Sequence, residues 1–103
     1  MPDPMRIRCQ LTGEKVAVRV IMAHPMETGL RRDEDGQAVA AWFIQRVTAT
    51  CNGQVVMTAQ WGPSVARNPF LQFNLKHAKA GDRIEIRWVD NRGETRTDGA
   101  TVS

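Results

Sequence analysis

RIEIRWV, residues 83–89, is the stretch that decides the fold. Its apolar side chains, Ile84, Ile86 and Trp88, alternate with charged ones and so recur at every second residue. Successive side chains of a strand point to opposite faces, whereas a helix would need apolar residues three and four positions apart. The stretch therefore predicts an antiparallel strand with one face on a core and the other in water.

The same period of two recurs in two other stretches. In KVAVRVIM, residues 15–22, three valines and Met22 fall on one face. In LQFNLK, residues 71–76, leucine and phenylalanine alternate with polar side chains. Both stretches are typical of half-buried strands.

Glycine-containing turns separate these runs. Asn52-Gly53 divides the run 42–50 from the run 54–61, and this dipeptide favours a hairpin turn in which both central residues take positive φ. Asn91-Arg92-Gly93 predicts a second hairpin after the strand that ends near Asp90. Short strands with turns at this spacing predict a β-sandwich or small barrel, and the length of 103 residues predicts a single domain spanning 1–103.

The charge pattern argues against nucleic-acid binding and membrane insertion. The chain has 14 basic and 11 acidic residues, but no run contains more than two consecutive basic residues. Nucleic-acid binders concentrate such residues on one face, and a membrane span needs about 20 apolar residues. The first ten residues, MPDPMRIRCQ, contain no apolar signal segment, which by itself predicts a cytoplasmic protein.

Candidates for catalysis are few. His24 and His77 are the only histidines, and Ser64 lies in a loop segment, GPSV, rather than in a nucleophile motif. Cys51 precedes a hairpin turn, where no helix N-terminus lowers the pKa of its thiol. Cys9 and Cys51 form no C-x-x-C pair, and whether either forms a disulfide is open. We predict neither an enzyme nor a cofactor.

A soft-metal site is an alternative. His24 stands between Met22 and Met26, and imidazole with thioether ligands selects copper(I). Methionine is more often a core filler, and Pro25 breaks the strand geometry before Met26. The sequence therefore favours no metal, with copper binding as the second hypothesis.

HPMETG, residues 24–29, lies in the one long irregular segment, 23–40. Pro25 fixes its own φ and holds the preceding residue extended, while a glycine permits conformations closed to other residues. We expect an ordered base at 24–29 and a looser tip near 33–36. Such a loop either displays His24 and Met26 to a partner or packs only on its own domain.

Four motifs together resemble the SoxZ family, the small subunit of the SoxYZ carrier complex of bacterial sulfur oxidation. They are HPMETG, the charged tip RRDEDG at 31–36, CNGQVV at 51–56 and WGPSVARNPFLQF at 61–73. The resemblance runs from about residue 6 to residue 102. It implies an all-β, immunoglobulin-like antiparallel sandwich of about seven strands, in agreement with the alternation above.

The resemblance also implies a heterodimer with SoxY, whose C-terminal Gly-Gly-Cys-Gly-Gly arm carries sulfur intermediates between periplasmic enzymes during thiosulfate oxidation. This sequence ends in TRTDGATVS, and neither Cys9 nor Cys51 replaces the carrier cysteine because a swinging arm needs a flexible tether. The expected role is therefore a non-catalytic scaffold for SoxY. The implied location is the periplasm, reached by export with a twin-arginine-signalled partner, in place of the cytoplasm.

The expected partner interface combines HPMETG with the most distinctive residues of the 61–73 motif. Its residues are His24, Pro25, Met26, Glu27, Thr28, Gly29, Trp61, Asn68, Pro69 and Phe70. A SoxZ-like carrier module serving a quinoprotein dehydrogenase is a further alternative. Without its partner such a sandwich exposes apolar surface or a strand edge, so homodimers of the isolated chain in a crystal would be unsurprising, while its oligomeric state stays open.

Overall fold

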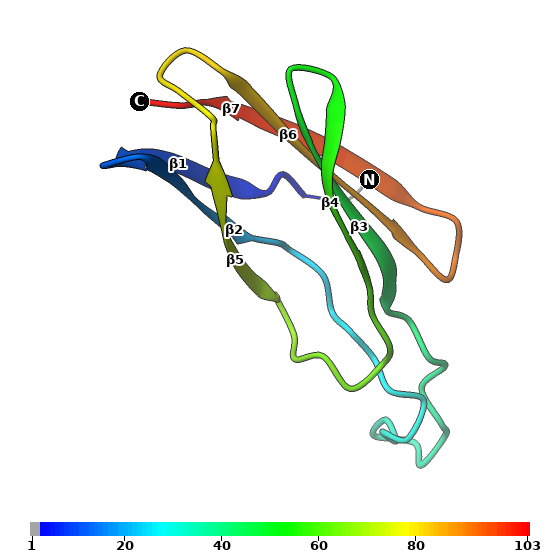
Figure 1. The fold of residues 1–103 in the computed structure, drawn as a ribbon. Helices are drawn as coiled ribbons and strands as arrows, with labels where there is room; N and C mark the ends of the chain where they lie inside the picture. The colour runs from blue at the N-terminus through cyan, green and yellow to red at the C-terminus, as the bar shows by residue number, and fades with distance from the viewer. Residues whose placement is uncertain (1–2) are drawn as a thin grey trace.

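The computed structural model describes residues 3–103 and consists of two stacked antiparallel sheets (Figure 1). One sheet has the strand order β1-β2-β5 and the other β4-β3-β6-β7. The strands are β1 (Arg6–Thr12), β2 (Lys15–Ile21), β3 (Ile44–Cys51), β4 (Gln54–Gln60), β5 (Phe70–Lys76), β6 (Arg83–Asp90) and β7 (Thr95–Thr101). This is the immunoglobulin-like β-sandwich that the family resemblance implies, and it is one of the two architectures that the alternation predicts. Within the described residues, no helix is long and apolar enough to cross a membrane.

The core lies between the central strands of the two sheets. Ile84, Ile86 and Trp88 of β6 face it with at most 1% of their surface exposed, and the valines of β2 face it fully buried. Both strands have a hydrogen-bonded neighbour on each side, so their inward side chains are covered most completely. Each fully buried aliphatic side chain contributes about 1.5–3 kcal/mol relative to the exposed state.

The hairpins follow the predicted turns. Asn52 and Gly53 take φ values of 50° and 86°, and Gly93 takes 80° in the β6–β7 turn. The sequence reading missed β1 and its turn to β2, in which Gly13 has φ 63°. The alternation in β1 is weak because only Cys9 is buried, while Ile7 is half-buried. Pairing with β2 and with the chain's last residues holds this strand in place.

The irregular segment between β2 and β3 forms an arm beyond the end of the sandwich (Figure 1). Two isolated β-bridges close it, one between Glu27 and Trp42 and one between Arg32 and Ala38. Its tip, where we expect a looser loop, contains a hydrogen-bonded turn. Asp33 Oδ1 accepts the backbone N–H groups of Asp35 and Gln37, each at 3.0 Å.

Truncation of the core should unfold the sandwich more readily than truncation of its surface. Ile86→Ala should lower the free energy of unfolding by about 2–5 kcal/mol, because it leaves a cavity in a fully buried site. Val55→Ala is the control, since Val55 is 64% exposed and its truncation should change stability by less than about 0.5 kcal/mol. Urea denaturation followed by tryptophan fluorescence measures both, and equal losses would contradict the assignment of the core.

Candidate functional site

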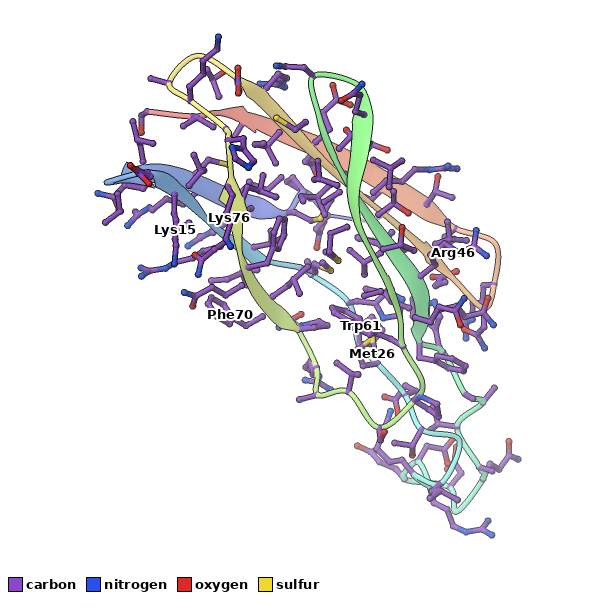
Figure 2. All side chains as sticks on the ribbon, in the orientation of Figure 1. Lys15, Met26, Arg46, Trp61, Phe70 and Lys76 are labelled. Carbon is purple, nitrogen blue, oxygen red and sulfur yellow. The ribbon has the colours of Figure 1, made fainter. Side chains whose placement is uncertain are left out.

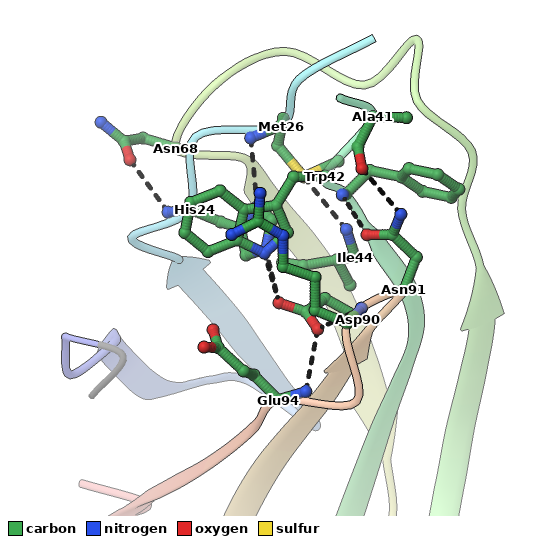
Figure 3. Close-up of polar contacts among 11 residues, drawn as sticks. His24, Met26, Ala41, Trp42, Ile44, Asn68, Asp90, Asn91 and Glu94 are labelled. Atoms are coloured by element: carbon green, nitrogen blue, oxygen red, sulfur yellow. Dashed lines mark hydrogen bonds and ion pairs between the residues drawn. The ribbon is translucent and has the colours of Figure 1, made fainter. Parts of the chain in front are cut away.

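The candidate site centres on the buried carboxylate of Asp90, at the end of β6 (Figure 3). Its Oδ2 accepts hydrogen bonds from Trp42 Nε1 at 2.8 Å and from His24 Nε2 at 3.1 Å. Its Oδ1 accepts the backbone N–H groups of Arg92 and Glu94, both at 2.9 Å. One side chain thus joins the β6–β7 turn to both ends of the arm.

The imidazole of His24 is held as one neutral tautomer. Its Nδ1 accepts a hydrogen bond from the backbone N–H of Met26 at 3.1 Å, so this nitrogen carries a lone pair. Nε2 therefore carries the hydrogen and donates the hydrogen bond to Asp90. The ring also meets Trp42 and Trp88 edge-on, with centroid distances of 5.3 and 5.1 Å. His24 is 3% exposed, and this enclosure makes it a structural residue.

Met26 turns the chain at the base of the arm. Its φ of 49° is unusual for a residue other than glycine, and its side chain is 5% exposed. The thioether sulfur accepts the backbone N–H of Ile44 at 3.3 Å, which ties the arm to the first residue of β3. The next residue, Glu27, forms an ion pair with Arg31 at 2.8 Å.

The carboxyl of Asp90 is ionised well below neutral pH. Burial alone would raise its pKa, but the hydrogen bonds from Trp42, His24 and the backbone of Glu94 and Arg92 outweigh burial and lower it. The Arg92 guanidinium also lies 3.9 Å from the centre of the Trp42 ring. The arrangement favours a fixed negative charge whose hydrogen-bond acceptors are satisfied.

The structure brings together two motifs that lie far apart in the sequence. His24 N–H donates to Asn68 Oδ1 at 3.1 Å, and Asn68 N–H donates back to the His24 carbonyl at 2.9 Å. The N–H of Met22 donates to the Pro69 carbonyl at 3.0 Å. HPMETG and the Asn-Pro-Phe segment are therefore neighbours at one end of the sandwich, as a shared surface would require.

The ten predicted interface residues differ in how far they reach solvent. Phe70 is 58% exposed at the start of β5, and Thr28 and Asn68 are exposed, whereas Trp61 is half-buried against the core (Figure 2). The buried members are His24, Met26, Glu27 and Pro69, and Pro25 and Gly29 are half-buried. Whether this set meets a partner stays a prediction.

The burial of His24 and Met26 bears on the two alternatives that the sequence left open for this loop. Their side chains point into their own domain, where hydrogen bonds hold them, and are not displayed on the surface. Asp90, the acceptor that organises the loop, was missed as a site residue. The available signal was its place one residue before Asn-Arg-Gly, where an aspartate accepts the N–H groups of a turn.

The geometry gives the copper hypothesis little support. Both ring nitrogens of His24 already have protein partners, and Met22 is fully buried. A metal at His24 would have to displace the N–H of Met26 or the bond to Asp90. Among residues 3–103, His, Cys, Asp and Glu side chains nowhere gather in threes as a metal site would need.

Both cysteines are free thiols held in the sandwich. Cys9 is 3% exposed, and burial raises the pKa of its thiol. Cys51 is half-buried, and burial together with the neighbouring Asp82 carboxylate raises the pKa of its thiol as well. Neither cysteine is therefore a reactive thiolate near neutral pH.

Comparison with known protein families identifies a family that this chain matches. The family model described as "Sulphur oxidation protein SoxZ" matches residues 5–101, nearly the whole chain. The matched range contains every residue of the candidate site. No curated protein matches the sequence significantly.

Removing the charge at Asp90 should destabilise the protein and weaken its acid sensitivity. In Asp90→Asn one amide oxygen replaces two carboxylate oxygens, so donors lose an acceptor at a cost of about 1–3 kcal/mol at neutral pH. Because folding lowers the pKa of Asp90, its ionised form stabilises the fold near pH 7, and this contribution disappears as the pH falls below about 4.

Denaturant unfolding at several pH values measures this effect. The difference between wild type and Asp90→Asn should be largest near pH 7 and shrink below about pH 4. Glu34→Gln in the exposed arm is the control and should leave the curve unchanged. A constant difference at all pH values would contradict the role given to the carboxylate.

Proposed function

This chain belongs to the SoxZ family of sulphur oxidation proteins, and we propose that within the Sox system it is the non-catalytic partner of a SoxY-type carrier subunit. In this role it forms the heterodimer that holds the carrier while sulfur intermediates are attached to the C-terminal cysteine of SoxY. The proposed compartment is the periplasm, reached by export together with that partner.

The observation that carries this proposal is the state of the two thiols. A carrier of covalent sulfur intermediates needs an accessible thiolate on a mobile segment, so that successive enzymes reach it. Cys9 lies within β1 and Cys51 at the end of β3, and both thiols have raised pKa values. The chemistry of attachment therefore belongs to the partner.

The candidate site supports a binding role in the same way. His24 is a neutral imidazole with both nitrogens engaged, so it is not free to act as a general base. Asp90 accepts four hydrogen bonds and is 2% exposed. These groups hold a loop in a fixed shape and so give a partner a rigid surface to recognise.

The exposed apolar residues near this loop indicate where the binding of a partner would bury the most apolar surface. Phe70 is 58% exposed, and Leu30, which directly follows HPMETG, is 87% exposed. Large apolar side chains that remain in solvent are the ones whose burial stabilises an interface. We place the heterodimer interface at the end of the sandwich that carries the arm and the start of β5.

The first test is assembly. Co-expression with a SoxY-type subunit should give one peak in size-exclusion chromatography, with light scattering that corresponds to one copy of each chain. Obligate interfaces commonly bury about 2,000 Å² or more, and an obligate heterodimer should elute intact at micromolar concentration. Two separate monomer peaks would rule the proposal out.

The second test places a charge in the interface. Phe70→Asp should weaken the heterodimer by about tenfold or more, because it puts a carboxylate where an apolar side chain is to be buried. Thr97→Asp introduces the same charge at an exposed position of β7 and should leave affinity unchanged. Calorimetric titration measures both, and equal effects would contradict the placement of the interface.

A further inference from the structure

The outward-facing side chains of β1, β2 and β5 carry basic groups and no carboxylate. Residues that pair in register share a face, so the outward positions follow directly from the pairing of β1 with β2 and of β2 with β5. We call this surface the basic face. Its basic side chains, all exposed, are Arg6, Arg8, Lys15, Arg19 and Lys76.

Like charges face each other across the strands of the basic face. Arg8 lies opposite Arg19, and Lys15 lies opposite Lys76. Directly opposed like charges destabilise a sheet, and Arg6, Arg8 and Arg19 form no ion pair with any residue of the described chain. The free chain therefore carries a repulsion that a surface of opposite charge would relieve.

Glu14 is an acidic residue at the lysine end of the basic face. It lies in the β1–β2 turn and lines a hollow together with Lys15, Lys76 and His77. The arginine end has no comparable neighbour among the residues that line its own hollow. The uncompensated charge is thus concentrated around Arg6, Arg8 and Arg19.

Two large apolar side chains lie beside these arginines. Ile21 and Phe70 pair in register and are 46% and 58% exposed. Together with the three arginines and Ile7 they line a hollow of about 340 Å³. Figure 2 shows Phe70, Lys15 and Lys76 along the same sheet, away from Arg46 on the other sheet. The basic face thus has an exposed apolar patch, Ile21 and Phe70, bordered by basic side chains.

The rest of the molecule has no excess of basic over acidic residues. The chain has 14 basic and 11 acidic residues; five of the basic ones lie on the basic face, which leaves nine against 11 elsewhere. On the outer side of the other sheet Glu85 stands between Arg83 and Arg87. With the exposed Arg46 of β3, the outer side of that sheet has three basic residues and one carboxylate, whereas the basic face has five basic residues and no carboxylate.

We propose that the basic face is the surface on which the carrier subunit docks, and that the carrier meets it with an acidic patch around an apolar side chain. This inference rests on the proposed function and names the face and the partner's chemistry. Buried arginines need carboxylate partners, and arginine with aromatic residues is enriched at protein interfaces. Phe70 also joins this face to the candidate interface at Asn68 and Pro69.

The composition of the face favours a protein over a nucleic acid. Nucleic-acid surfaces combine basic residues with aromatic platforms on which bases stack. Here the exposed aromatic side chain is paired with Ile21, an aliphatic residue that offers no such stacking. The apolar patch of Ile21 and Phe70 can pack against an aliphatic or aromatic side chain of a protein partner.

Single charge reversals on the basic face test the inference through binding of this chain to the carrier subunit. Biolayer interferometry with immobilised SoxY-type carrier subunit measures association rates at low salt and at about 0.3 M NaCl. Arg8→Glu and Arg19→Glu should each slow association at low salt by about tenfold, and the rate for the wild type should fall steeply with salt. Each reversal also creates an opposite-charge pair across the strands, so the variants are expected to fold, which circular dichroism checks.

Arg87→Glu on the outer side of the other sheet is the matched control and should stay within about twofold of the wild type. Equal rates for all three variants would overturn the docking face while leaving the heterodimer intact. No association of the wild type would overturn both the face and the proposed function. Tighter binding of the free wild-type chain to a single-stranded oligonucleotide or to anionic lipid vesicles than to the carrier would assign the face to that ligand instead.

Discussion

Four hydrogen bonds to one buried carboxylate organise the end of the sandwich that carries the arm. Asp90 holds the β6–β7 turn through two backbone N–H groups, and it holds the arm through Trp42 and His24. A buried charge is costly unless its acceptor sites are filled, and here all four bonds are present. The fixed shape of the HPMETG loop depends on this carboxylate.

The same hydrogen bonds explain why His24 and Met26, which could be metal ligands by residue type, have a structural role in the loop. His24 satisfies one donor and one acceptor at once, which only the neutral imidazole can do. Met26 adopts a positive φ and accepts a backbone hydrogen bond through sulfur. Proline and glycine on either side allow this tight path. The loop is therefore a rigid element of the surface, which suits a subunit that binds its partner in one pose.

The two faces of the β1-β2-β5 sheet differ in character: one builds the core and the other is the face that we propose for docking. Inward valines of β2 build the core, and the outward side chains of the same strand, together with those of β1 and β5, build the basic face. A search for runs of basic residues along the sequence does not find this face. Its basic residues are separated along each strand by inward-facing ones, and the pairing of three strands brings them together. Uniform charge on a sheet surface has a cost in repulsion, and a partner of opposite charge offsets it.

The sequence by itself determined the class of fold, since alternation at 83–89 and glycine-containing hairpins are set by local backbone sterics. The motifs also indicate the SoxZ family without the tertiary structure. Only the tertiary structure decided which way His24 and Met26 face, that β1 completes the first sheet, and that Asp90 is their common anchor. His24 and Asp90 are 66 residues apart, and Trp42 and Asp90 are 48 apart. Side-chain pairing at such separations follows from how the sheets stack, and residue spacing along the chain carries no record of it.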